Sequence, residues 1–297
     1  MNKKIIVPLD GSELAEVVLP FAEEVVGRTG SELILISVRE LNDSRSLRML
    51  QSYLEKIAET AKVNAEKYQK YPGGEPVNVR WEILKGNPAE EIVAFANKED
   101  ESRIMMATHG QSGFTRWALG SVADKVSRVI NRPITLIRAK GSRPAVHERG
   151  FFNKILAPLD GSKESEVTIP DVEELARSME ADVTLLQVVK LENAIVSYMG
   201  IKGIESLKAS AKDYLEQLTA RMQNKGISTK YVMIETRGDI AEEINNYTAQ
   251  NYIDLVVMAT HGRSGPRRWV LGSVANKVLN EGNTPIMLIR TPRADGE

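Results

Sequence analysis

Residues 106–122 combine the residue types that commonly hold a phosphate group. The stretch carries glycines at positions 110, 113 and 120, and Ser121 follows the last of them. Glycine lets the backbone approach an anion closely, and a helix N-terminus offers unpaired N–H groups with a favourable dipole. The pattern therefore predicts a strand end, a phosphate-binding loop and a helix that begins at Gly120 and Ser121. In a single copy, ordinary turns and a helix cap would be the favoured interpretation of the same residues.

The pattern occurs twice in the chain. Residues 106–126 recur as residues 258–278, at an offset of 152, with 16 of 21 positions identical. Residues 4–12 recur as residues 154–162, and both copies end in Asp-Gly-Ser, beginning at Asp10 and Asp160. A repeat of about 150 residues has the size of a complete domain. We therefore expect a tandem duplication, with one domain at 1–140, a linker at 141–152 and a second domain at 153–297.

Short apolar segments alternate with helical patterns in each copy. In the first copy, strands are expected at 4–9, 33–38, 77–83, 104–106 and 134–137, and helices at 13–28, 44–70, 88–98 and 121–131. This alternation predicts an α/β fold of two tandem domains, each with a doubly wound, parallel, five-stranded sheet. The ligand site of such a sheet lies beyond the carboxyl ends of the strands, where the winding reverses.

Three local features refine this expectation. Residues 77–83 alternate between apolar and polar, which is typical of a strand near the edge of a sheet. Pro20 and Pro170 fall inside the first helix of each copy and should kink it. Residues 101–103 are charged or polar, so we expect the strand before the loop to be shorter in the first copy than in the second.

The composition excludes several function classes. The 297 residues include 39 basic and 40 acidic side chains, so no net field favours a nucleic acid or an anionic membrane. The chain has no cysteine, which excludes a disulfide scaffold, a thiol nucleophile and cysteine-ligated metals. No apolar run has the length of a signal peptide or a membrane span. We therefore expect a soluble, cytoplasmic protein that has neither nucleic-acid nor membrane partners.

The duplicated motif resembles that of the universal stress proteins, a family with an adenine nucleotide alpha hydrolase-like fold. The motif of the nucleotide-binding members looks like Gly-x2-Gly-x9-Gly-Ser/Thr after the fourth strand, and an Asp stands at the end of the first strand. This chain reads Ala107-x2-Gly110-x9-Gly120-Ser121 with Asp10, and Ala259-x2-Gly262-x9-Gly272-Ser273 with Asp160. Alanine replaces the first glycine in both copies and loses that glycine's access to positive φ.

The resemblance implies a stress-response regulatory protein that binds ATP, with Mg or Mn on its phosphates, and has no fast catalysis. It places adenine near the ends of the first two strands, at Asp10 and Val38, and at Asp160 and Val188. Ribose and phosphates would meet the loops at Ala107, His109, Gly110, Gly120, Ser121 and Val122, and at Ala259, His261, Gly262, Gly272, Ser273 and Val274. A Glu in place of Gly120 or Gly272 should then repel phosphate and leave the fold largely intact.

His109 and His261 occupy equivalent motif positions and suggest a catalytic acid or a metal ligand. A general base needs an orienting partner and a metal needs several ligands, yet the neighbouring positions are Ala, Thr, Gly and Ser. Hydrogen bonding within the loop is therefore the preferred interpretation. It leaves the expected site without catalytic or metal-binding residues.

Two other functions remain open at this stage. One is a slow enzyme that hydrolyses ATP or phosphorylates itself, although the sequence lacks Gly-x4-Gly-Lys-Ser/Thr, Gly-x-Gly-x2-Gly and Ser-Gly-Gly-x-Asp-Ser loops. The other is a dimerisation or interaction module that binds no nucleotide, which the Ala-for-Gly replacements allow.

The fifth strands suggest how the copies associate. Residues 134–138 and 286–290 are apolar and fall at a sheet edge, and an exposed apolar edge favours strand pairing. Universal stress proteins commonly dimerise through this strand. We therefore expect an intrachain pseudo-dimer and a possible homodimer.

Overall fold

The computed structural model describes residues 3–39, 44–69, 75–109, 119–138, 150–191, 193–262 and 271–291. The side chains of residues 44 and 193–202 are outside this description. The chain divides into two compact units, unit 1 at Met1–Phe151 and unit 2 at Phe152–Glu297. The expected boundaries at 140 and 153 stay a prediction, because residues 139–149 are not described.

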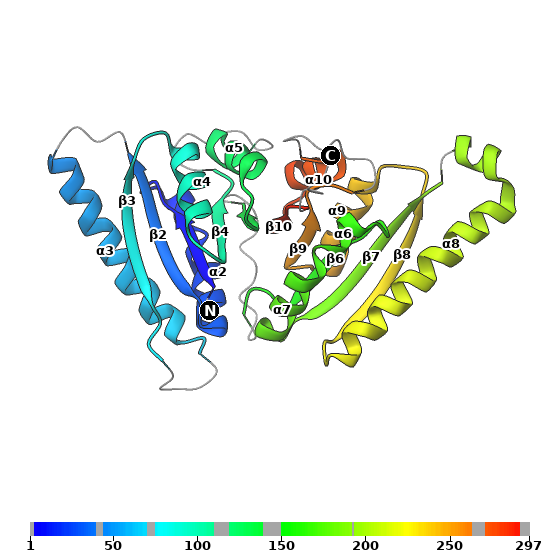
Figure 1. Ribbon diagram of the computed structural model, residues 1–297, viewed down its shortest axis with the longest axis horizontal. Helices are drawn as coiled ribbons and strands as arrows, with labels where there is room; N and C mark the ends of the chain where they lie inside the picture. The colour runs from blue at the N-terminus through cyan, green and yellow to red at the C-terminus, as the bar shows by residue number, and fades with distance from the viewer. Residues whose placement is uncertain are drawn as a thin grey trace. The chain divides into compact units, whose positions relative to one another are not determined.

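Unit 1 contains a parallel sheet whose strand order is β3-β2-β1-β4-β5 (Figure 1). The strands are β1 (Lys4–Pro8), β2 (Glu32–Arg39), β3 (Val79–Lys85), β4 (Ser102–Ala107) and β5 (Ile134–Ile137). The strand β1 pairs in parallel with both β2 and β4, so the winding reverses beside β1. The alternating strand β3 lies at one end of this order, as the sequence predicts.

Helices of unit 1 cover both faces of this sheet. They are α1 (Glu13–Glu16), α2 (Leu19–Thr29), α3 (Ser44–Glu66), α4 (Pro88–Lys98) and α5 (Ser121–Val129). The helices α2 and α3 contact each other and strands β1 to β3, whereas α4 contacts α5, β2 and β4. Ile5, Ile6 and Val7 in the central strand are at most 2% exposed, so the core lies around β1. This sandwiched position explains why β1 is almost wholly apolar.

Unit 2 repeats the same architecture with the order β10-β9-β6-β7-β8. Its strands are β6 (Lys154–Pro158), β7 (Asp182–Lys190), β8 (Thr229–Thr236), β9 (Leu255–Ala259) and β10 (Ile286–Ile289). Its helices are α6 (Lys163–Glu166), α7 (Ile169–Met179), α8 (Asn193–Asn224), α9 (Ile240–Asn251) and α10 (Ser273–Glu281). The predicted doubly wound α/β fold with two five-stranded sheets is therefore confirmed.

Two local expectations are corrected by the structure. Pro20 and Pro170 do not kink a continuous helix: each lies in the first turn of a new helix, α2 or α7, after a short helix has ended. Proline suits a first turn because its missing N–H has no intrahelical acceptor there. The strand β4 is also longer than β9, with six residues against five, because Ser102 and Arg103 are buried within it. The expectation of a shorter first-copy strand was wrong.

The last residues of unit 1 are fixed to its helix α2. Phe151 donates its backbone N–H to the Glu24 carboxylate at 2.6 Å, and its ring lies 4.7 Å from that of Phe21. A Cβ at Gly150 would lie 1.8 Å from Glu24 Oε1, and Gly150 has a φ of +112°. Only glycine fits this position, for both steric and conformational reasons. The contact explains why unit 1 extends as far as Phe151.

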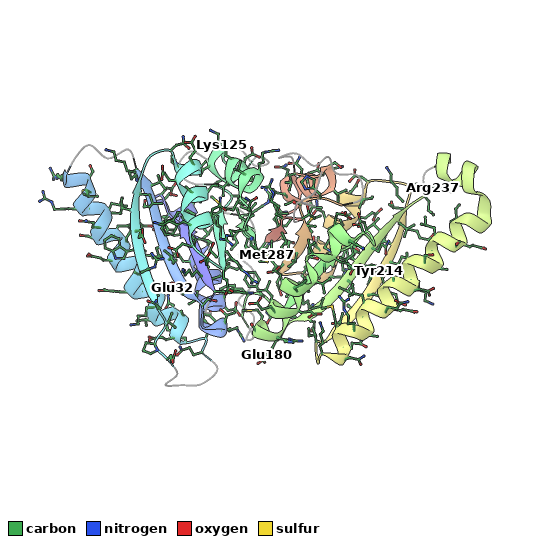
Figure 2. The ribbon with its side chains drawn as sticks, in the orientation of Figure 1. Glu32, Lys125, Glu180, Tyr214, Arg237 and Met287 are labelled. Atoms are coloured by element: carbon green, nitrogen blue, oxygen red, sulfur yellow. The ribbon has the colours of Figure 1, made fainter. Side chains whose placement is uncertain are left out.

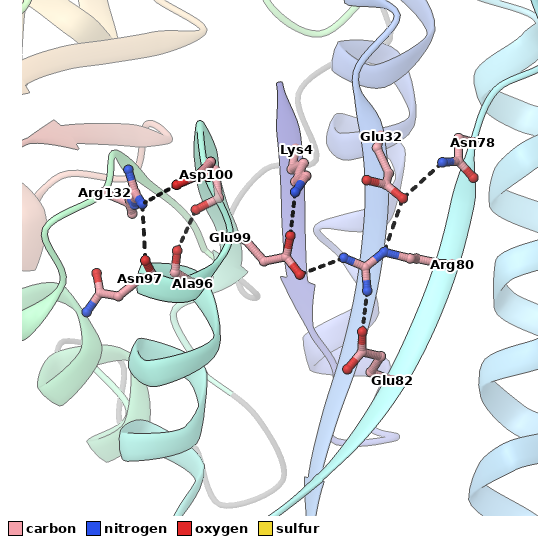
Figure 3. Close-up of polar contacts among 11 residues, drawn as sticks. Lys4, Glu32, Asn78, Arg80, Glu82, Ala96, Asn97, Glu99, Asp100 and Arg132 are labelled. Carbon is pink, nitrogen blue, oxygen red and sulfur yellow. Dashed lines mark hydrogen bonds and ion pairs between the residues drawn. The ribbon is translucent and has the colours of Figure 1, made fainter. Parts of the chain in front are cut away.

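An ion network joins the amino ends of three strands in unit 1 (Figure 3). Arg80 on β3 donates to Glu99 at 2.8 Å and to Glu32 at 3.1 Å, and it also pairs with Glu82. Lys4 on β1 binds the same Glu99. Burial raises the pKa of Glu99, but the hydrogen bonds and charges of Lys4 and Arg80 outweigh it and leave the pKa lowered. The ionised carboxylate therefore stabilises unit 1.

We expect Glu99→Gln to lower the unfolding free energy of unit 1 by about 1–2 kcal/mol at pH 7. Because the folded pKa is lowered, the stabilisation is present above the ordinary value of 4.5 and disappears as the pH falls through the folded value. Hydrogen exchange of the unit 1 strands, measured over a series of pH values from 7 downward, should show a difference that is largest at pH 7 and shrinks as the pH falls below 4.5. Glu82→Gln, at a more exposed partner of Arg80, is the matched control and should have a smaller effect. A difference that does not shrink as the pH falls would contradict this assignment.

Candidate functional site

The Asp-Gly-Ser segments form the same turn at the carboxyl ends of β1 and β6. Gly11 and Gly161 have φ values of +79° and +76°, which favour glycine. Ser12 donates to Asp10 Oδ1 from its backbone N–H at 3.0 Å and from its hydroxyl at 2.6 Å. The Ser12 hydroxyl also caps α1, since it accepts from the N–H of Ala15 at 3.2 Å. The turn therefore fixes the first-strand carboxylate against the start of a helix.

The same contacts recur in unit 2. Ser162 donates to Asp160 from its backbone and its hydroxyl, and it accepts from the Ser165 N–H at 3.1 Å. Two independent parts of the chain thus build one local structure around an aspartate.

The loop after the fourth strand closes on itself in each unit. The N–H of Gly120 donates to the Thr108 carbonyl oxygen at 2.8 Å, and the N–H of Gly272 donates to that of Thr260 at 2.8 Å. A Cβ at Gly272 would lie 2.9 Å from this oxygen, and one at Gly120 would lie 3.0 Å from its counterpart. The fold itself therefore needs glycine at position 272. The expectation that Gly272→Glu leaves the fold largely intact does not hold.

The helices α5 and α10 begin directly at these closure points. Gly120 and Gly272 are their N-caps, and neither helix has a side-chain hydrogen bond at its cap. Ser121 and Ser273 follow and are exposed, whereas Val122 and Val274 are half-buried. An N-terminus of this kind presents backbone N–H groups and a partial positive charge. Both units therefore place an anion-binding feature beside the end of the fourth strand.

The first-strand aspartate meets the fourth-strand loop in unit 2. A Cβ at Gly262 would lie 2.4 Å from Asp160 Oδ2, so only a glycine leaves room for this carboxylate. The equivalent Gly110 lies outside the described residues, as do the loop segments 110–118 and 263–270. The structure thus brings together Asp160, Gly262 and the start of α10 at the switch point of the sheet.

The alanines at the first glycine position of the motif are accommodated without strain. Ala107 and Ala259 are the last residues of β4 and β9, where they pair with Ile137 and Ile289. Both are buried, and neither has a positive φ. The extended backbone suits any residue, so the replacement of glycine costs no conformational freedom that the loop requires.

The two motif histidines have equivalent surroundings. His109 Nδ1 lies 3.0 Å from the Thr108 hydroxyl, and His261 Nδ1 lies 3.1 Å from the Thr260 hydroxyl. His261 Nε2 is buried and has no hydrogen-bond partner among the described residues. Buried polar atoms normally have a hydrogen-bond partner from the protein or from an ordered water molecule, so this nitrogen is a candidate for contact with a ligand. The described part of the chain contains no cluster of three His, Cys, Asp or Glu side chains that could hold a metal ion.

Val38 and Val188 lie beside the aspartates, at the carboxyl ends of β2 and β7. In unit 1, Pro8 pairs with Ile36, and the next residue, Leu9, donates to the Ile36 carbonyl oxygen at 2.8 Å. Val38 lies two residues after Ile36 in the chain. Both Val38 and Val188 are half-buried. These apolar side chains line the same end of the sheet as the aspartates.

Sequence reasoning missed a tyrosine and a glutamate that flank each aspartate. The Tyr53 hydroxyl on α3 donates to Glu16 at 2.8 Å. Burial first, and then Glu16, raise the pKa of Tyr53, and the charge of Asp10 adds to the effect. Glu16 and Glu166 recur at the offset of 150, which is the signal that an alignment of the two copies would have given.

Unit 2 has the same set of residues with a different hydrogen-bond state. Tyr214 on α8 (Figure 2) has a pKa raised by burial and by the charges of Glu166 and Asp160. Its hydroxyl nevertheless has no partner of good hydrogen-bond geometry among the described residues. Glu166 and Tyr214 nevertheless lie near each other in unit 2, and a hydrogen bond with Glu166 contributes to the raised pKa of Tyr214.

Together, these features define a tandem, doubly wound α/β protein with a candidate anion-binding site in each unit. The sequence profile of the universal stress protein family matches residues 1–138 and 151–290. The chain therefore belongs to the universal stress protein family and contains two copies of its domain. Among the described residues, no helix is both long and apolar enough to cross a membrane.

Relatives of one domain and of two domains are similar to the chain. Universal stress protein YxiE of Bacillus subtilis is 27% identical over 152 residues, which cover 47% of this chain and all of YxiE. A universal stress protein of Methanothermobacter thermautotrophicus is 32% identical over 48% of this chain and 97% of its own length. A solved universal stress protein from Archaeoglobus fulgidus has a TM-score of 0.69 at 16% identity, over 97% of this chain and 98% of that one. This last likeness concerns the fold alone.

We expect Gly272→Ala to destabilise unit 2 by about 1–3 kcal/mol, because the added methyl group would press against the Thr260 carbonyl oxygen. Hydrogen exchange should accelerate at the backbone N–H of residue 272, which donates to the Thr260 carbonyl oxygen. Ser273→Ala changes the neighbouring exposed residue and serves as the matched control, with little effect expected. Equal exchange in both variants would show that the loop closes in another way.

Proposed function

We propose that the chain is a regulatory protein of the stress response that binds ATP and has no fast catalysis. The proposal rests on one arrangement, found in each unit, in which an aspartate turn and an uncapped helix N-terminus flank the switch point of a parallel sheet. Membership of the universal stress protein family supports the assignment to stress response.

In this proposal, adenine lies near the aspartate and valine at the ends of the first two strands, at Asp10 and Val38 or at Asp160 and Val188. The ribose and phosphates lie against the loop that follows the fourth strand and against the first turn of α5 or α10. The contacting residues proposed are Ala107, His109, Gly110, Gly120, Ser121 and Val122, and Ala259, His261, Gly262, Gly272, Ser273 and Val274.

The described residues suit such a ligand. The glycines let the loop backbone approach the aspartate and the end of the fourth strand closely, the helix N-termini supply donors, and His261 Nε2 is a buried polar atom without a described partner. Four or five hydrogen bonds to a charged group, at about 1.5–3 kcal/mol each, exceed an immobilisation cost of about 4 kcal/mol or more. We therefore expect a dissociation constant of about micromolar order. Mg or Mn would be carried on the phosphates, because the described side chains offer no cluster of metal ligands.

We expect Ser121→Asp together with Ser273→Asp to lower ATP affinity at least about tenfold. An aspartate in the first turn stabilises a helix, so the fold is preserved, but its charge repels phosphate at the same N-terminus. The isosteric, uncharged pair Ser121→Asn and Ser273→Asn is the matched control and should bind nearly as the wild-type chain does. Titration calorimetry with ATP and Mg would measure both. Equal affinity in the two double variants would contradict the placement of phosphate.

We also expect turnover far below the usual enzyme rates of about 1–1000 per second. The aspartate in each unit already accepts hydrogen bonds from its own turn, and it has no neighbouring base in the motif. Phosphate release from ATP by the purified chain would measure this rate. A rate above about one per second that survives contaminant controls would favour an enzyme instead.

The fifth strands support a further proposal about assembly, in which the two copies pair within one chain and the chain can form a homodimer. The proposal rests on their apolar sequence and on family resemblance. Residues 1–151 expressed alone should then self-associate or bind the other half, as measured by mass in solution. A fragment that stays monomeric and ignores unit 2 would contradict pairing through this strand.

A further inference from the structure

We propose that the two sites are not equivalent: Arg39 closes the adenine end of the unit 1 site, so that ATP binds first in unit 2. This inference rests on the proposed function, since it concerns the same sites. It adds a residue that decides which unit is occupied.

Arg39 is the last residue of β2 and crosses from there to the end of β1. Its Nη2 donates to the main-chain carbonyl oxygen of Asp10. The same nitrogen lies 3.6 Å from the position that a Cβ on Gly11 would take. The guanidinium therefore covers the backbone of Asp10 and Gly11, next to Val38. This is the end of the sheet at which the adenine ring is proposed to lie.

The Arg39 guanidinium also lies within electrostatic range of the Tyr53 hydroxyl. The charges of Asp10 and Arg39 both act on the Tyr53 hydroxyl, which itself donates to Glu16 at 2.8 Å. Arg39 is therefore tied to the end of β1 by its bond to the Asp10 carbonyl oxygen, near a tyrosine that Glu16 and Asp10 also influence. A nucleotide base that entered this space would have to displace a side chain that is already hydrogen-bonded.

Unit 2 lacks this side chain at the equivalent position. Pro8 pairs with Ile36 and Pro158 pairs with Leu186, so Arg39 and Val189 each lie three residues beyond the matched pair. Val189 is 6% exposed and apolar, and it cannot donate to the Asp160 carbonyl oxygen. Asp160, Glu166 and Tyr214 are nevertheless kept. The end of the unit 2 sheet therefore has the same polar groups, but its second strand carries no donor side chain at the position of Arg39. The cation whose charge acts on Tyr214 is instead Arg221, on the helix α8.

The helix N-terminus at which phosphate is proposed to lie also differs between the units, and this difference too favours binding in unit 2. The first turn of α5 contains Asp124, whereas the corresponding residue of α10, at the offset of 152, is Asn276. Asp124 pairs with Arg128 at 2.8 Å, which balances part of its charge. A carboxylate near a helix N-terminus competes with a bound phosphate for the same field. Asn276 carries no such charge, so α10 is the better anion-binding helix.

Displacing Arg39 removes a hydrogen bond between a charged donor and a carbonyl oxygen. Bonds of this class are strong enough to change an affinity by about ten- to a hundredfold. A difference of that size is sufficient for ATP to fill unit 2 while unit 1 stays empty.

The test is titration calorimetry of the full chain with ATP and Mg. We expect the wild-type chain to bind one ATP at a concentration that saturates unit 2, and Ser273→Asp to remove that site. Arg39→Val should bring the stoichiometry to two by raising the affinity of unit 1 about ten- to a hundredfold. Adding Ser121→Asp to Arg39→Val should return the stoichiometry to one, which assigns the gained site to unit 1.

The matched control is Lys85→Val. Lys85 is exposed and pairs with Arg39 across β2 and β3, so its replacement removes the same charge without opening the end of β1. We expect the stoichiometry to stay at one in this variant. Two equal sites in the wild-type chain, or an unchanged or weakened unit 1 in Arg39→Val, would overturn the inference and leave the proposed function standing. A wild-type chain that binds no ATP at all would instead contradict the proposed function, and this inference with it.

Discussion

The backbone hydrogen bond from Gly272 to Thr260, and its counterpart from Gly120 to Thr108, determine where the helix after each loop begins. Each bond joins the first residue before a helix to the residue that follows a strand. The helix N-terminus is thereby held at the carboxyl end of the fourth strand, beside the end of the first. A side chain at the glycine would meet the carbonyl oxygen, so the closure and the helix position depend on one residue type. The rest of each candidate site is arranged around this fixed point.

The sequence predicted the features that depend on local pattern. Apolar runs, helix periodicity and the repeat offset were sufficient to predict the strands, the two-domain organisation and the position of the loop. The predictions that failed concern tertiary context. Ser102 and Arg103 are polar but buried, so a pattern of hydrophobicity alone makes β4 too short. Pro20 starts a new helix because a separate short helix ends just before it.

The groups around each aspartate could not be assigned from single motifs, because they come from elements far apart in the chain. Tyr53 and Glu16 are 37 residues apart, and Arg39 reaches Asp10 across 29 residues. Their side chains meet only once β1, β2, α1 and α3 are packed. Comparing the two copies at the repeat offset would have revealed the shared glutamate and the unshared arginine, whereas the two tyrosines match only when α3 and α8 are aligned separately. The duplication thus provides an internal reference within a single sequence.

The two copies retain the same turn and loop closure, yet differ in the contacts that support them. Glu99, which binds Lys4 and Arg80 in unit 1, corresponds to Asn251 in unit 2, whose carbonyl oxygen lies 3.4 Å from Lys154 Nζ. At these equivalent positions, unit 1 has the ion network and unit 2 does not. It lies at the amino ends of the strands, away from the carboxyl ends that carry the candidate site. Stability and ligand contacts are thus separated along the length of the sheet.

The central place of β1 has a consequence for the synthesis of the chain. Lys4 pairs with Glu32 on one side but with Ser102 on the other, 98 residues later in the sequence. At a translation rate of about 5–20 residues per second, β1 emerges from the ribosome about 5–20 seconds before its second neighbour. During that interval Ile5, Ile6 and Val7 can be covered only by β2 and the first helices. The nascent chain therefore carries an unpaired strand edge, and the sequence between β2 and β4 sets how long it remains open to wrong partners.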